Sequence, residues 1–150
     1  LIGVVSDPDE FVAFIKSLTG CKNLTKLYLG DMVVGNDVSE PIEALNNLIS
    51  HKDCCIELLL LSGWNIGDKL RDFSSSLSRS IHLKVLDLSN CGIKDIQTGF
   101  VELCSVLRNT PLKELYLDDN PFGDDGAKLL SLSLRQNPEL EVLSLKFCKI

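Results

Sequence analysis

Apolar residues recur at fixed places along this 150-residue chain, in segments that begin at Leu24, Ile56, Leu83, Leu112 and Leu140. In every segment the first, fourth, sixth and eleventh residues are apolar, and successive starts lie 32, 27, 29 and 28 residues apart. Self-similarity at such a period is typical of a solenoid, in which each unit buries its apolar side against its neighbours.

Two different spacings alternate within each unit. The alternation around the fourth and sixth positions predicts a strand, with those two side chains in the core and positions 3, 5 and 7 on the opposite face. Between the strands the spacing lengthens toward that of a helix, and Asp7-Pro8 provides a cap for a helix from about Pro8 to Leu18. The predicted buried stripes of these helices are Phe11, Phe14, Leu18; Leu70, Phe73, Leu77; and Ala127, Leu130, Leu134.

The fourth unit resembles a known family. The run from Pro111 to Leu130, PLKELYLDDNPFGDDGAKLL, looks like a repeat of the ribonuclease-inhibitor type of leucine-rich repeat. The resemblance implies an α/β solenoid, a horseshoe segment with parallel strands on the concave face and helices on the convex face. It also implies that the ninth residue of a unit satisfies backbone groups in the turn after the strand. Cys91, Asn120 and Cys148 fit that role, whereas Met32 and Trp64 depart from the pattern.

The resemblance covers nearly all of residues 1–150, which we expect to form a single domain of about five repeats. Residues 1 to 23 are predicted to be the end of a preceding repeat, with Leu1 to Val5 as the tail of its strand. Because solenoids normally need polar caps over their terminal units, we expect the chain to be part of a longer array.

Positions 3, 5 and 7 of the strands supply the candidate binding surface. Tyr28, Leu58, Leu60 and Val85 are predicted to form one exposed apolar patch, and such patches often mark interfaces. Beside it, Asp87, Glu114, Asp118 and Asp119 are predicted to surround Tyr116, an aromatic anchor of the kind enriched in binding hot spots. This surface suits a protein partner with a basic, partly apolar surface; the alternative is an irregular sheet that binds nothing.

Charge and cysteine content narrow the classes of function. A formal net charge of −6 disfavours nucleic acid as a partner, and no apolar run is long enough to cross a membrane. Cys91 and Cys148 occupy one repeat position, which favours a packing role, reduced thiols and a cytoplasmic location over disulfides. The adjacent pair Cys54-Cys55 has no second pair to complete a metal site, and we expect no metal or cofactor.

Catalysis is not expected. Neither His51 nor His82 has a repeated nucleophile as partner, and a serine-rich stretch from Ser74 to Ser80 is predicted to be a solvated helix face, with phosphorylation as the alternative. The sequence thus favours a recognition scaffold in a regulatory, innate-immune or cytoskeletal protein. Two alternatives stay open. One is a purely structural spacer; the other is a GTPase activator, because Ran GTPase-activating proteins have similar repeats. The arginines of this chain that could serve such an activator, Arg71, Arg79, Arg108 and Arg135, are all predicted in or near helices.

Overall fold

The computed structural model describes residues 7–32, 37–94 and 98–150. Within them strands and helices alternate along the chain, and the strands form one parallel sheet in sequential order, β1-β2-β3-β4-β5. The elements are α1 (Pro8–Ser17), β1 (Lys26–Tyr28), α2 (Ser39–Ile49), β2 (Leu58–Leu60), the 3-10 turn η1 (Gly67–Lys69), α3 (Leu70–Leu77), β3 (Val85–Asp87), α4 (Thr98–Leu107), β4 (Glu114–Tyr116), α5 (Gly123–Leu134) and β5 (Val142–Ser144). All five predicted strands are present, in the predicted register.

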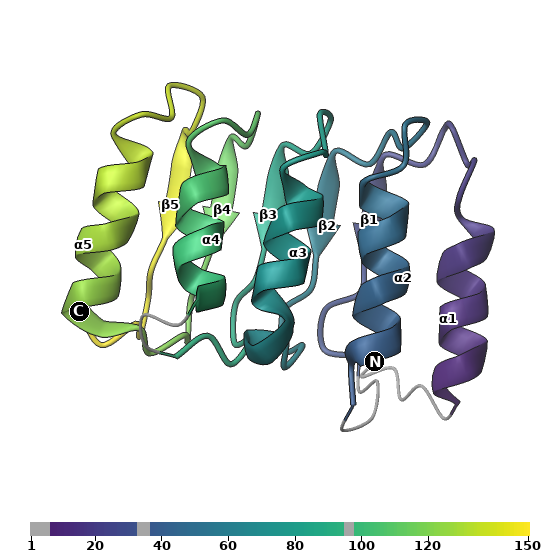
Figure 1. Ribbon diagram of the computed structural model, residues 1–150, viewed down its shortest axis with the longest axis horizontal. Coiled ribbons are helices and arrows are strands. Elements are labelled where there is room, and N and C mark those ends of the chain that lie inside the picture. The colour runs from purple at the N-terminus through teal and green to yellow at the C-terminus, as the bar shows by residue number, and fades with distance from the viewer. Residues whose placement is uncertain (1–6, 33–36, 95–97) are drawn as a thin grey trace.

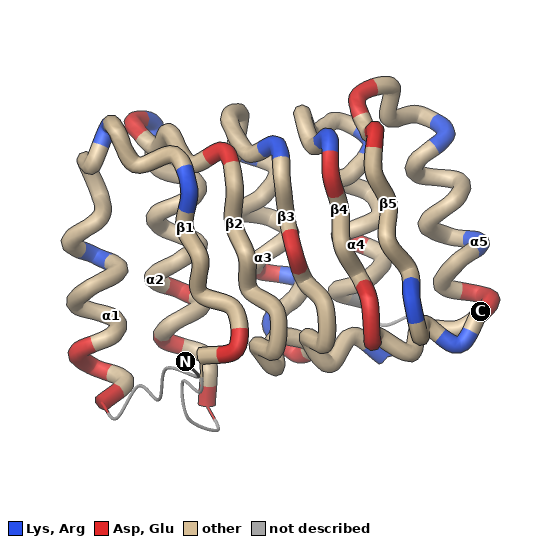
Figure 2. Tube along the Cα trace, turned by 180° about the vertical axis from the view of Figure 1, so that it is seen from behind, with Lys and Arg blue, Asp and Glu red and all other residues tan. Residues whose placement is uncertain are grey.

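The helices form a layer on one face of the sheet (Figure 1). Seen from the other side, the strands lie in front with no element of the described chain over them (Figure 2). We call this uncovered side the open face; it is the face that the sequence predicted to be concave. The solenoid therefore has a two-layer cross-section, and its core lies between sheet and helices.

The core follows the predicted alternation. At the fourth position, Leu59, Leu86 and Leu115 are fully buried, and Leu27 is nearly so. In contrast, Leu143 at the same position of β5 is 39% exposed, although the sequence placed it in the core. Within the described residues β5 pairs only with β4 and no further unit packs beside it, whereas at the other edge of the sheet α1 packs against α2 and helps to cover the unit of β1. Val34, the eleventh residue of the first unit, and the segment Leu1 to Val5 lie outside the described residues.

The first helix begins where its cap predicts. The Asp7 carboxylate accepts a hydrogen bond from the Asp9 backbone N–H at 2.9 Å, and Pro8 occupies the first turn, where it needs no donor. The buried face of α1, however, is formed by Phe11, Val12 and Ile15, and Phe14 is 48% exposed. The prediction that Phe14 lies in the core was wrong, because α1 turns the Phe11–Ile15 stripe toward the sheet and leaves Phe14 on its flank.

The serine-rich helix α3 also departs from its prediction. Ser74 and Ser76 of α3, and Ser80 just after it, are buried rather than solvated, since α3 is packed between α2 and α4; Ser78 is exposed as predicted. The Ser74 hydroxyl donates to the Leu70 carbonyl at 2.7 Å, so the burial of this polar group is compensated within the helix. Small side chains here allow the neighbouring helices to approach closely.

The ninth position of the second to fifth units links each of them to the unit before. Its side chain donates a hydrogen bond to the backbone carbonyl of the sixth residue of the preceding unit, about one repeat earlier in the sequence. The bonds are Trp64 Nε1 to Leu29 (2.7 Å), Cys91 Sγ to Leu61 (3.2 Å), Asn120 Nδ2 to Leu88 (2.7 Å) and Cys148 Sγ to Leu117 (3.2 Å). Trp64, which departs from the family pattern, thus makes the same contact as the Cys and Asn residues.

Candidate functional site

The side chains predicted for the binding surface lie on the open face. Strand residues at positions 3 and 5 are exposed or half-buried, and the residue between them is buried in β1 to β4. The register places equivalent positions side by side: Leu58 pairs with Lys26 and Val85, and Leu60 pairs with Tyr28 and Asp87. Neighbouring strands of a sheet are about 4.8 Å apart, so these side chains form continuous rows across the sheet.

The apolar half of the site spans β1 to β3. Leu58, Leu60 and Val85 are half-buried, and Tyr28 is 60% exposed. Leu58 lies beside Val85, and Tyr28 lies beside Leu60, so the structure brings all four predicted residues together. Between Leu58 and Leu60, Leu59 is fully buried on the other face of the strand and belongs to the core.

The acidic half spans β3 and β4. The Tyr116 hydroxyl donates to Glu114 Oε2 at 2.7 Å, which fixes both side chains on the open face. Asp87 Oδ1 accepts from the Ser89 backbone N–H at 2.8 Å. Each carboxylate thus has one oxygen engaged in an internal hydrogen bond that sets its orientation, and a partner can use the other oxygen without reorganising the site.

Asp118 continues the acidic half toward the end of β4. Its Oδ1 accepts the backbone N–H of Lys146 at 2.8 Å, a bond between adjacent repeats that the repeat pattern did not predict. Asp119, also predicted for the site, lies in the turn beyond β4 with φ of 57° and is exposed. It therefore belongs to the edge of the open face rather than to the sheet itself.

The acidic groups act electrostatically on Tyr116. The pKa of Tyr116 is raised above its ordinary value, first by the hydrogen bond to Glu114, then by partial desolvation and by the charges of Glu114, Asp87 and Asp118. No ion pair within the described residues engages Asp87, Glu114 or Asp118. Their negative charges can therefore attract positively charged groups that approach the open face.

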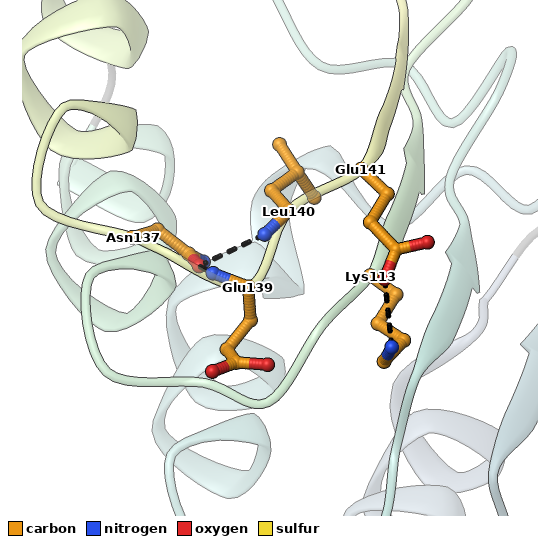
Figure 3. A network of polar contacts seen from close by, with 5 residues as sticks. All are labelled: Lys113, Asn137, Glu139, Leu140 and Glu141. Atoms are coloured by element: carbon orange, nitrogen blue, oxygen red, sulfur yellow. Dashed lines mark hydrogen bonds and ion pairs between the residues drawn. The ribbon is translucent and has the colours of Figure 1, made fainter.

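The lysines at the opposite end of the same strands are already paired. Lys84 Nζ lies 2.9 Å from Glu57 Oε1, and Lys113 Nζ lies 2.7 Å from Glu141 Oε1 (Figure 3). Near the second pair, the side chain of Asn137 accepts the backbone N–H groups of Glu139 and Leu140 and orders the turn into β5 (Figure 3). These exposed pairs add little stability, but they neutralise the two lysines that directly precede β3 and β4.

Other kinds of site find little support in the described part of the chain. No group of three or more His, Cys, Asp or Glu side chains there is placed to hold a metal ion. His82 is exposed, and the His51 ring accepts the Asp53 backbone N–H at 3.2 Å, each in the turn before a strand. No described helix is both long and apolar enough to span a membrane.

One exposed residue beside this site was missed from the sequence. Phe147 lies in the turn after β5 and is 80% exposed. Its position in the repeat could have identified it, because Phe147 is the eighth residue of its unit and the other units carry Asp, Gly, Asn and Asp at that position.

Comparison with known proteins finds relatives with the same kind of repeat. A leucine-rich-repeat family profile, described as "Leucine Rich repeat", matches residues 79–96 and 108–131. Ribonuclease inhibitor from Mus musculus is 42% identical over 71 residues, covering 45% of this chain and 15% of the relative. "NACHT, LRR and PYD domains-containing protein 4C" from Mus musculus is 26% identical over 173 residues, covering 95% of this chain and 17% of the relative.

A solved structure has the same fold. The chain described as "Leiomodin-1 Actin-Binding Site 2 (ABS2)" superposes with a TM-score of 0.59 at 19% identity, covering 75% of this chain and 63% of that one. This chain spans only 15 to 17% of the length of the curated relatives named above. The profile match, the ribonuclease-inhibitor relatives and the sheet of five parallel strands agree with one another: the chain is an α/β leucine-rich-repeat solenoid, and its repeats are similar to those of ribonuclease inhibitor.

Proposed function

We propose that this chain is a protein-recognition scaffold that binds one partner protein on the open face of its sheet. The observation that carries the proposal is the juxtaposition of a partly exposed apolar patch (Tyr28, Leu58, Leu60 and Val85) with oriented carboxylates around Tyr116 that form no ion pair within the described residues. Burying apolar area provides affinity, whereas charges of one sign select the partner and its orientation. The partner surface that fits is basic on one side and apolar on the other.

The relatives are compatible with this class of function. Ribonuclease inhibitor is named for acting on a ribonuclease, and the leiomodin-1 chain is named as an actin-binding site. Similar folds host different partners, so the partner of this chain has to be argued from its own surface. In this proposal the protein is not an enzyme, and its location is cytoplasmic.

The main competing function, activation of a GTPase through a catalytic arginine, is not favoured by the geometry. Arg71 lies in α3, and Arg79, Arg108 and Arg135 follow the C-terminal ends of α3, α4 and α5. All four therefore belong to the helical side of the molecule. A catalytic arginine has to reach the nucleotide of the bound GTPase, so none of them is placed to act from the open face.

Selection from a displayed library of random peptides tests the proposal on the full chain. We expect the enriched peptides to combine Lys or Arg with aliphatic or aromatic residues, and their binding to weaken with salt. Enrichment of acidic peptides, or binding that does not depend on the open face, would contradict the proposal.

Two sets of substitutions locate the binding. The triple variant Asp87→Asn, Glu114→Gln, Asp118→Asn removes three charges but keeps an oxygen that accepts each internal hydrogen bond, so the fold is preserved. We expect the affinity of the selected peptides to fall at least about tenfold, which corresponds to about 1.4 kcal/mol. The matched control removes three charges from exposed positions on the helices, with Glu10→Gln, Glu40→Gln, Glu43→Gln, and leaves the affinity within about twofold.

A separate variant tests the apolar half. Leu58→Thr with Val85→Thr places β-branched side chains, which suit a strand, at both positions but removes apolar contact area from the open face. We expect a loss of affinity without a change in the salt dependence, because the carboxylates are untouched. An unchanged affinity would show that the apolar patch is no part of the interface.

A further inference from the structure

The turn after each strand imposes an unusual backbone conformation on the eighth residue of the unit. Its φ is positive in all five units: Asp31 (55°), Gly63 (82°), Asn90 (52°), Asp119 (57°) and Phe147 (57°). Glycine, asparagine and aspartate tolerate this left-handed region, whereas a bulky aromatic residue there is an outlier. Phe147 is therefore strained at a position where four other units carry suitable residues.

Phe147 is also unusually exposed. Its side chain is 80% accessible, more than that of any other large apolar residue in the described chain. The eighth residue is exposed in the other four units too, including those whose strands, β2, β3 and β4, have neighbours on both sides. The exposure thus belongs to the position in the repeat, and packing of a neighbouring unit does not remove it. Neither the backbone conformation nor the burial of Phe147 indicates that this residue stabilises the fold.

Charged groups of both signs surround the Phe147 turn. Lys146 and Lys149 are exposed on either side of it, and neither forms an ion pair within the described residues. The turn is bonded to the acidic end of β4, since the Lys146 backbone N–H donates to Asp118 Oδ1 and the Asp119 N–H donates to the Lys146 carbonyl, both at 2.8 Å. Basic residues at the end of β5 thus lie beside acidic residues at the end of β4 (Figure 2).

We propose that Phe147 is an apolar anchor for the same protein partner that occupies the open face, and that the interface extends over the ends of β4 and β5. This inference rests on the proposed function and adds to it the charge pattern of the partner. Its basic part faces Asp87, Glu114 and Asp118, and an apolar pocket with an acidic group beside it receives Phe147 between Lys146 and Lys149. The contact is continuous with the open face because Asp118 belongs to both. Such a pair of opposite charges fixes one orientation of the partner and disfavours the reverse.

The first measurement asks whether Phe147 serves the fold. Phe147→Asn and Phe147→Gly introduce residues that other units carry at this position and that accept a positive φ. We expect the melting temperature of the full chain to stay the same or to rise in both variants. A fall of several degrees in both would show that the ring supports the fold, and it would overturn the proposal.

The second measurement uses peptides selected from the displayed library on the wild-type chain. We expect Phe147→Asn to lower their affinity at least about tenfold, and Lys146→Gln with Lys149→Gln to weaken only those peptides that contain Asp or Glu. Phe14→Gln is the matched control, because Phe14 is a half-exposed phenylalanine on α1. The affinity of this control variant is expected to be unchanged.

The outcomes separate this inference from the proposed function. If the open-face triple variant abolishes binding and Phe147→Asn does not, the inference is overturned and the proposed function stands. If Phe147→Asn abolishes binding and the triple variant does not, Phe147 belongs to a separate site, and both the shared interface and the proposed function are overturned. Loss of binding in both variants, with Phe14→Gln unaffected, supports both.

Discussion

Asn120 is the residue whose replacement tests the internal architecture of the solenoid most directly. Its side chain is fully buried and makes hydrogen bonds in both directions between the third and fourth units. Its Oδ1 accepts the backbone N–H groups of Cys91 at 3.1 Å and Ile93 at 3.0 Å, and its Nδ2 donates to the Leu88 carbonyl at 2.7 Å. Asn120→Ala removes the side-chain partner of all three backbone groups at once.

The expected loss follows from those three groups. A buried donor or acceptor left without a partner costs about 1 to 3 kcal/mol, and the space left by the amide can admit a water molecule that recovers part of it. We therefore expect Asn120→Ala to lower the free energy of unfolding by about 3 to 5 kcal/mol. Asn120→Cys retains a donor for the Leu88 carbonyl, as Cys91 does for Leu61, but loses the two accepted bonds. Its cost should be smaller than that of Ala.

Urea denaturation followed by circular dichroism provides the measurement, with Asn47→Ala as the control. Asn47 is exposed on α2, and its replacement should change the free energy of unfolding by no more than about 0.5 kcal/mol. A loss below about 1 kcal/mol for Asn120→Ala would refute the reasoning, since it would mean that the bonds between units are not needed to satisfy these backbone groups.

Three further predictions concern the core, the thiols and the acidic half of the open face. Leu115→Ala should lower the free energy of unfolding by about 2 to 5 kcal/mol, because Leu115 is fully buried, whereas Leu143→Ala in β5 should lower it by less. Equal losses of the two variants in chemical denaturation would contradict the observed burial. A thiol reagent at about pH 8 should modify the exposed Cys21 quickly and Cys91 only on unfolding, since burial raises the Cys91 pKa to about 12. After denaturation without reductant, the same reagent should titrate six thiols. Ultraviolet titration should show Tyr116 ionising above the ordinary tyrosine pKa. The contribution of its hydrogen bond to stability is therefore complete below about pH 10 and is lost as the pH rises through the folded pKa. Ionisation at or below the ordinary value would contradict the hydrogen bond to the neighbouring carboxylate of Glu114.

Much of the candidate site was predictable because it depends on alternation within single strands. Once Leu115 is assigned to the core, Glu114 and Tyr116 must lie on the other face, and the repeat register places Leu58 beside Val85. What the pattern did not provide is the internal bonding of the site. Asp118 was selected only as an exposed charge, yet its carboxylate is bonded to the turn of the next unit.

The period of the solenoid, the position of every strand and the side of each strand that faces the core all follow from the order of residues along the chain. These properties are encoded locally, because the spacing of apolar residues along one element fixes which of its faces can be buried. The folded arrangement was needed to show that Trp64 replaces Asn or Cys as a hydrogen-bond donor to the preceding unit and that Ser74 and Ser76 of α3 are buried. It was also needed to show that Phe14 is exposed and that Phe147 has a positive φ. These features depend on groups about one repeat away in sequence, or on the geometry of a turn, and only stacking of the units brings those groups into contact.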